Sequence, residues 1–143
     1  MKYRKMTYNK KLQVSSKGNN EVINITDSVA AAVNESGVKD GVVTVFVVGS
    51  TAAITTTEYE PGLVNYDLEA VFEKIAPANA EYEHEKTWHD DNGHSHVRAS
   101  LVGPSITVPI VGGELTLGTW QQIILIDFDT RARNRTVVCQ ILS

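Results

Sequence analysis

The chain has 143 residues, of which 42% are hydrophobic and 21% are charged, and its formal net charge at pH 7 is −4. This length fits a single domain over residues 1–143, and no apolar run is long enough to cross a bilayer. The acidic balance argues against a nucleic-acid partner, and the basic clusters at residues 2–11 and 131–135 are interpreted as solvated strand ends or turns.

Residues 1–14 alternate polar and apolar side chains, which indicates a strand. Gly18-Asn19-Asn20 then favours a turn, so we predict a first hairpin in which residues 21–25 form the partner strand. The apolar stripe that follows has helical spacing and stops at Ser36-Gly37. This pattern predicts a short helix that packs on the core.

The β-branched run over residues 41–48 predicts a central strand buried on both faces, and residues 52–57 predict a second strand. Between them, Gly49, Ser50 and Thr51 form a bend that offers hydroxyls and backbone amides. Such a bend can hold an anion if the amides point the same way. A plain turn is the alternative interpretation.

Apolar residues at helical spacing over residues 63–75 predict a second, longer helix that ends before Pro77. Residues 78–91 show no clear periodicity but are rich in side chains that can bind metals. Two strands around an arginine-rich turn, at residues 122–129 and 136–142, complete the chain.

The segment between Asn92 and Gly103 allows two interpretations. Asn92 can cap a helix and Gly103-Pro104 can end it, whereas the alternation over residues 94–100 is typical of a strand. We favour the helix because both of its ends are marked. A helix would separate His94 from His96 by more than a quarter-turn, and the two would then have different roles.

Residues 106–110 alternate, Gly112-Gly113 favours a turn with positive φ, and residues 114–117 begin a return strand. We therefore predict a hairpin. The sequence Gly118-Thr119-Trp120-Gln121 then interrupts the sheet, in a pattern that can aim side chains at a site. Across the chain, strands and helices follow one another without regular βαβ repetition, which predicts an α+β fold with two main helices and a short third helix.

Cys139 is the one cysteine of the chain and lies in the apolar alternation of residues 137–141. It cannot form an internal disulfide, so we expect a small core residue. The first residues lack the apolar stretch of a secretion signal. Both features favour a cytoplasmic protein.

Two blocks of sequence carry a family resemblance. The first has the pattern Asn-x3-His-x-Arg-Ala-Ser at residues 92–100, and the second joins Ser105, spaced aliphatic residues and Gly-x4-Gly-Thr-Trp-Gln up to residue 123. On these residues the chain resembles the YjbQ-like family, also called the secondary thiamine-phosphate synthase family. The resemblance implies a compact α+β domain of largely antiparallel sheets, associated as a homotrimer.

All the histidines of the chain, His84, His89, His94 and His96, fall within residues 84–96. Neutral imidazoles bind zinc well, and three of them with an open position make a catalytic site. Their spacing matches no zinc signature, so an exposed loop that has collected histidines is the alternative. The resemblance matches His84 and His96 to histidines of the family. We predict a divalent ion, Zn or Mg, on His84, His89 and His96, with His94 contacting the substrate.

The resemblance places the family's acidic residue at Glu58, which would act as a base near His96. Arg98 offers a permanent bidentate donor for phosphate or carboxylate. We expect Glu58 and Arg98 to be the catalytic residues. The alternatives are an ordinary surface glutamate and a helix-surface charge.

The remaining expectations concern substrate binding. The family's common His-Thr-Thr-Ala bend reads Gly49-Ser50-Thr51-Ala52 here, so an imidazole is missing, and Ser50 and Thr51 remain as binding groups. Trp120 would stack on a planar heterocycle while Gln121 forms hydrogen bonds to it, although a tryptophan is more often a core residue.

The resemblance implies an enzyme that joins an aminopyrimidine pyrophosphate to a thiazole phosphate and releases pyrophosphate, with this activity as a possible secondary one. Two alternatives remain open at this point. One is a metal-dependent hydrolase or lyase acting on a small phosphorylated metabolite, and the other is a non-enzymatic trimer that binds a metal or a metabolite.

Overall fold

The computed structural model describes residues 5–143, so residues 1–4 of the predicted first strand and of the first basic cluster lie outside the described residues. The strands form two antiparallel sheets, sheet A with the order β1-β8-β3-β5-β6 and sheet B with the order β2-β7-β4. Their bounds are β1 (Thr7–Ser16), β2 (Glu21–Asn24), β3 (Gly41–Val48), β4 (Ala52–Glu58), β5 (Ser105–Val111), β6 (Glu114–Leu115), β7 (Gln121–Asp127) and β8 (Arg133–Leu142).

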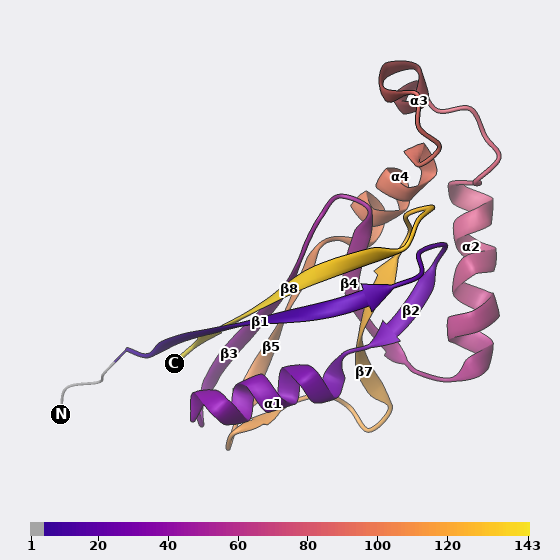
Figure 1. The fold of residues 1–143 in the computed structure, drawn as a ribbon. Helices are drawn as coiled ribbons and strands as arrows, with labels where there is room; N and C mark the ends of the chain where they lie inside the picture. Colours follow the sequence, from indigo (N-terminus) through magenta and orange to yellow (C-terminus); the bar gives the residue numbers. More distant parts are fainter. Residues whose placement is uncertain (1–4) are drawn as a thin grey trace.

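Within residues 5–143, four α-helices accompany the sheets, and a π-helical turn, η1, runs directly into one of them (Figure 1). Their bounds are α1 (Thr26–Ser36), η1 (Leu63–Asp67), α2 (Leu68–Ile75), α3 (Glu83–Trp88) and α4 (Gly93–Val102). The predicted α+β fold with largely antiparallel sheets, two main helices and a short third helix is confirmed, and α4 is the helix rather than the strand.

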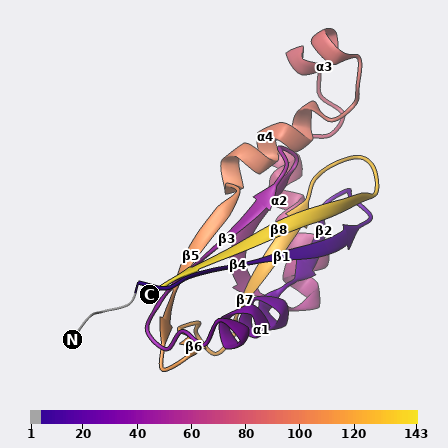
Figure 2. The same cartoon turned by 60° about the vertical axis from the view of Figure 1, so that its left-hand side comes forward.

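Sheet B lies between sheet A and a layer formed by α2 and α4 (Figures 1 and 2). One core fills the space between the two sheets and α1, and a second core fills the space between sheet B and helices α2 and α4. Strand β7 contributes to both, because Ile123 and Leu125 enter the first core while Ile124 and Ile126 enter the second. Strand β7 is therefore buried on both faces.

The prediction that residues 41–48 are buried on both faces is wrong. Strand β3 does occupy the middle of sheet A, and Val43, Val45 and Val47 on its inner face are fully buried. On its outer face, however, Phe46 is 41% exposed and Val48 is 52% exposed. The β-branched composition indicated a buried strand, but it cannot tell one covered face from two.

The predicted first hairpin is also wrong, because its two strands belong to different sheets. β1 pairs with β8, and β2 pairs with β7. Between β1 and β2, residues 18–20 all have positive φ and carry the chain from sheet A to sheet B. A Cβ on Gly18 would lie 2.5 Å from the carbonyl oxygen of Asp129, so this crossing requires a glycine.

Helix α3 was not predicted, because its six residues bury no side chain and therefore show no apolar stripe. It stands clear of both sheets at the far end of α4 (Figures 1 and 2). We refer to residues 77–92, which include α3, as the arm. The arm is attached to α4 through Gly93, whose N–H donates to Glu85 Oε1 at 2.6 Å. A Cβ on Gly93 would lie 2.6 Å from Cβ of Tyr82, so glycine permits this close approach.

Candidate functional site

Helix α4 places Arg98 on its buried side, where the residue is 1% exposed. Nε donates to the carbonyl oxygen of Ala76 at 2.9 Å, Nη1 donates to Oδ1 of Asn20 at 2.9 Å, and Nη2 donates to Glu73 Oε1 at 2.6 Å. The hydrogen bond from Arg98 holds the pKa of Glu73 below its ordinary value. The guanidinium thus ties α4 to the end of α2 and to the turn before β2.

This geometry bears on the predicted catalytic role of Arg98. Each of its three nitrogens already donates to a protein oxygen, and the side chain is enclosed. The alternative of a helix-surface charge does not describe it either. In this arrangement Arg98 acts as a structural anchor and presents no free edge to a phosphate.

His94 occupies the same buried side of α4 and is 6% exposed. Its Nδ1 is the one enclosed side-chain polar atom without a hydrogen-bond partner among residues 5–143. Burial, and next the charge of Arg98, lower the pKa of His94 and favour the neutral imidazole. Tyr82 of the arm lies beside His94, with ring centroids 6.3 Å apart, and the contact between His94 and a substrate stays a prediction.

His84 and His96 come together where α3 meets α4, with ring centroids 4.4 Å apart. Nε2 of His84 lies 3.2 Å from Oδ1 of Asp90 and 3.2 Å from the side-chain amide of Asn92. Asn92 begins α4 without capping it through its side chain, contrary to the capping expected from sequence, because that amide is directed at His84 and Asp90. Nδ1 of His84 is left as the nitrogen for a metal ion.

The structure brings together two of the three predicted metal ligands. His89 ends α3 in the left-handed region, with φ of 55°, and its side chain is exposed. Residues 5–143 hold no group of three or more histidine, cysteine, aspartate or glutamate side chains arranged to bind a metal. The residues present therefore fit a divalent ion in part, with two imidazoles and a carboxylate beside one of them.

Glu58, Trp120 and Gln121 lie at the opposite end of sheet B. Glu58 faces Gln121 across the β4–β7 pair, while Ala52 faces Asp127 at the end near α4. Six residues of extended strand span about 20 Å. Within one chain, Glu58 is therefore not close to His96.

Trp120 and Gln121, the predicted binding residues near Glu58, differ in whether their side chains are free to contact a ligand. Trp120 is 71% exposed and is not a core residue. The amide of Gln121 is used at both ends, because Nε2 donates to Thr56 Oγ1 at 3.0 Å and Oε1 accepts the N–H of Gly118 at 3.0 Å. Trp120 is free to contact a ligand, whereas Gln121 holds the local turn in place.

The predicted binding bend at residues 49–51 lies beside a buried ion pair. Thr51 is buried, and its hydroxyl donates to Asp129 Oδ2 at 3.0 Å and accepts from Arg135 Nη2 at 2.6 Å. Ser50 is exposed. Ser50 therefore remains available to a ligand, while Thr51 belongs to the network below it.

Arg135 anchors this network and was missed as a buried residue. It is 7% exposed and donates from Nε to Asp127 Oδ2 at 2.7 Å and from Nη2 to Oδ1 at 2.8 Å. The solvated interpretation of residues 131–135 is wrong for this residue. Period-two spacing was the available signal, because residues 135, 137, 139 and 141 share the inner face of β8. Cys139 on that face is fully buried, as predicted, and burial raises its pKa to about 11.

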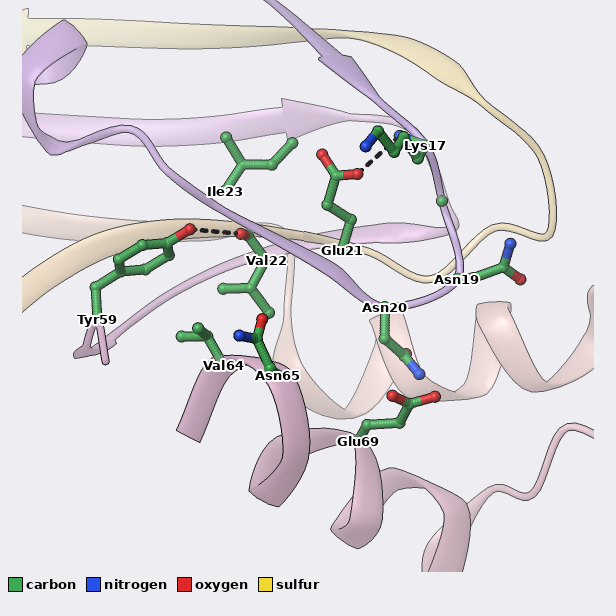
Figure 3. A pocket seen from close by; sticks show the side chains of 11 residues that line it. Lys17, Asn19, Asn20, Glu21, Val22, Ile23, Tyr59, Val64, Asn65 and Glu69 are labelled. Atoms are coloured by element: carbon green, nitrogen blue, oxygen red, sulfur yellow. Dashed lines mark hydrogen bonds between the residues drawn. The ribbon is translucent and has the colours of Figure 1, made fainter. Parts of the chain in front are cut away.

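One hollow on the surface, about 630 Å³ in volume and without the histidine pair in its lining, lies along the edge of β2 beside η1 and α2 (Figure 3). Its lining mixes carboxylates and amides, and Tyr59 there donates its hydroxyl proton to the carbonyl oxygen of Val22 at 3.2 Å. It includes no histidine and none of the predicted site residues. We therefore assign it no chemistry.

Residues 10–143 match the model of a protein family described as UPF0047 protein YjbQ-like. The chain belongs to this family. A UPF0047 protein of Methanothermobacter thermautotrophicus is 38% identical over 130 residues, which cover 91% of this chain and 88% of that protein. Solved structures of YjbQ-like proteins show the same fold. A YbjQ-like protein of unknown function from Sulfolobus solfataricus has a TM-score of 0.92 and 33% identity, over 98% of this chain and 99% of that chain.

A YjbQ/UPF0047 protein from Clostridium acetobutylicum has a TM-score of 0.83 and 36% identity, over 92% of this chain and 98% of the other. Membership of the YjbQ-like family, expected from the two sequence blocks, is thus confirmed. The family relationship establishes the fold but names no reaction. Among the helices of residues 5–143, none has the length and apolar character needed to cross a membrane.

Proposed function

We propose that this YjbQ-like protein is a metal-dependent enzyme that acts on a small phosphorylated metabolite. The observation that carries the proposal is the apposition of His84 and His96, with ring centroids 4.4 Å apart and Asp90 beside His84. His84 and His96 would hold the ion, and imidazole ligands favour zinc over magnesium. A divalent ion bound there supplies positive charge that stabilises a departing phosphate or pyrophosphate.

The first reaction to test is the one implied by the family's alternative name, the joining of an aminopyrimidine pyrophosphate to a thiazole phosphate. A second candidate is hydrolysis or elimination on another phosphorylated metabolite. The burial of Arg98 favours this second class, because the arginine expected to neutralise a departing pyrophosphate is already paired with Glu73. The two candidates share the same histidines and differ in substrate.

The test combines metal analysis with turnover on purified protein. We expect about one divalent ion per chain, and we expect chelation to abolish release of phosphate or pyrophosphate from a panel of phosphorylated metabolites. Formation of thiamine phosphate with pyrophosphate release identifies the first reaction. Release without it identifies the second. Metal binding without turnover on any substrate would point to a binding protein and contradict the proposed enzyme.

We also propose that the protein works as a homotrimer with sites between subunits. Glu58 and Trp120 lie too far from the histidines to join them within one chain. Exposed apolar side chains also remain on the outer face of sheet A and on α4, namely Phe46, Val48, Val97 and Leu101. A trimer would cover such surface and bring the two ends of neighbouring chains together.

Mixed trimers test this arrangement. Glu58→Ala and His96→Ala chains are each expected to be inactive, and random mixing of the two restores about one quarter of wild-type activity if each site uses one residue from each neighbour. Light scattering gives the mass of the assembly. A monomer at micromolar concentration, or mixed chains without activity, would contradict the shared site.

A further inference from the structure

The bend between β3 and β4 presents hydrogen-bond donors without acceptors. The backbone N–H groups of Gly49, Ser50 and Thr51 donate to no atom of residues 5–143. Directly behind the bend lies Arg135, whose Nε and Nη2 are paired with Asp127 and Thr51. Its Nη1 has no acceptor within the described chain. Successive N–H groups of a bend can bind an anion where they point to the same place.

The position of Nη1 follows from Gly49. A Cβ placed on Gly49 would lie 2.7 Å from Nη1 of Arg135, so this nitrogen lies over the glycine. Among residues 5–143, the only enclosed side-chain polar atom that lacks a partner is Nδ1 of His94. The unpaired Nη1 therefore reaches solvent, although Arg135 as a whole is 93% buried, its exposed fraction being 7%.

Beside the bend the surface is hollowed. Gly49, Ser50 and Ser100 line a hollow of about 240 Å³ between the bend and the C-terminal part of α4. Ser100 donates its hydroxyl proton to the carbonyl oxygen of His96, one helical turn earlier. The hollow is thus one turn of α4 away from the histidine pair.

We propose that the bend at Gly49 and Ser50, together with Nη1 of Arg135, binds the phosphoryl group of the substrate. The identity of the ligand as a phosphate rests on the proposed function. The hydrogen-bond donors that form the site are independent of that function. Arg135 takes the role that the sequence suggested for Arg98, because it keeps one edge of its guanidinium free. The absence of a side chain at position 49 leaves that edge open to a ligand.

The charge balance defines how the site binds. Arg135 and Arg133 are offset by Asp127 and Asp129, which lie within 4 Å of them, so the network is formally neutral. Attraction therefore comes from short-range N–H and O–H donation rather than from net positive charge. A tetrahedral oxyanion with several acceptor oxygens can use these donors together.

Calorimetric titration of metal-free protein with inorganic phosphate tests the site. Gly49→Ala places a methyl group against Nη1, and we expect it to weaken phosphate binding by at least about tenfold. Ser50→Ala removes one exposed hydroxyl and is expected to weaken it about fivefold. Gly37→Ala is the matched control, because Gly37 also has positive φ but no atom lies within 4 Å of its Cβ position.

Each outcome decides the proposal. Wild-type affinity in Gly49→Ala and Ser50→Ala, or no phosphate binding by the wild type, overturns the site. Equal weakening in Gly37→Ala assigns the effect to backbone strain and also overturns it. Metal content is measured on the same variants and should be unchanged. Phosphate binding by the wild type without turnover on any substrate would contradict the proposed enzyme and leave the anion site standing.

Discussion

Helix α4 carries Arg98 on its buried side and His96 on the side that meets the arm, and these two side chains differ in how completely they are paired. On the buried side, Arg98 uses all of its nitrogens in hydrogen bonds to three different segments. On the side that meets the arm, His84 and His96 contact each other and keep ring nitrogens unused, with His84 still 28% exposed. Within Arg135 there is a similar difference, because Nε and Nη2 donate to Asp127 whereas Nη1 has no acceptor among residues 5–143.

This difference separates structural from functional polar groups. A buried group with every donor satisfied contributes to stability, and its removal leaves its partners without hydrogen bonds. A group with unused donors or ring nitrogens gains nothing further from its own chain and is available to a ligand. Variants on the two sides of α4 should therefore change different observables.

The largest effect is expected from Arg98→Met. It removes three hydrogen bonds and leaves Asn20, Glu73 and the carbonyl group of Ala76 without their donor, so the free energy of unfolding should fall by about 3 kcal/mol. Urea denaturation measures the change. Lys86→Met is the control, since the Lys86–Glu83 pair is 65% and 87% exposed and should contribute little. An effect of equal size in both variants would contradict the anchoring role of Arg98.

The ion pair between Arg98 and Glu73 predicts a pH dependence of stability. The pKa of Glu73 lies below its ordinary value of 4.5 because Arg98 donates to the carboxylate. A carboxyl group whose pKa is lowered in the folded state stabilises the fold at pH values above its ordinary pKa. This contribution is lost as the pH falls through the lowered pKa of the folded state. The difference in unfolding free energy between wild type and Arg98→Met should therefore shrink between pH 7 and pH 3. A constant difference would show that Glu73 is not coupled to Arg98.

On the other side of α4, His96→Ala should reduce metal affinity by at least about 100-fold, or about 2.7 kcal/mol, while the fold stays intact. Elemental analysis and circular dichroism measure the two quantities. His89→Ala is the matched control, because the exposed His89 ring makes no contact of the kind that joins His84 and His96, and the variant should retain the metal. Retention of the metal in His96→Ala, or its loss in His89→Ala, would exclude the assigned ligand pair.

Asp90→Asn should have a smaller effect on the same site. Oδ1 of Asp90 lies 3.2 Å from Nε2 of His84 and orients the ring, so the loss of its charge should lower metal affinity about tenfold, or about 1.4 kcal/mol. Asp91→Asn serves as the neighbouring control, because Asp91 accepts instead from Thr130. Identical metal titrations for the two variants would remove Asp90 from the site.

Trp120→Ala should change the free energy of unfolding by less than about 0.5 kcal/mol, because the side chain is 71% exposed. Loss of a stacking surface should instead raise KM for an aromatic substrate about fivefold, with turnover nearly unchanged. Thermal unfolding and steady-state kinetics separate the two effects. A strong loss of stability in a protein of unchanged mass would show that Trp120 packs within the chain.

Local patterns were sufficient for most elements of the YjbQ-like fold. Helical spacing and end signals located α1, α2 and α4, and alternation with Gly112-Gly113 located the β5–β6 hairpin. These features depend on residues close in sequence, where backbone preferences and side-chain periodicity act directly. Helix α3 could not be predicted in this way, because a helix with no buried side chain has no periodic pattern of apolar residues in its sequence.

Strand pairing and the accessibility of polar groups required the tertiary structure. Whether residues 7–16 pair with residues 21–24 or with β8 depends on contacts between distant segments, and here β8 is the partner. In the same way, Arg98 and Arg135 are equally charged in the sequence, but the oxygens that surround each one come from other elements. Only their positions leave Arg98 with no free nitrogen and Arg135 with one, because the hydrogen-bonding capacity of a side chain is used up by neighbours that the fold supplies.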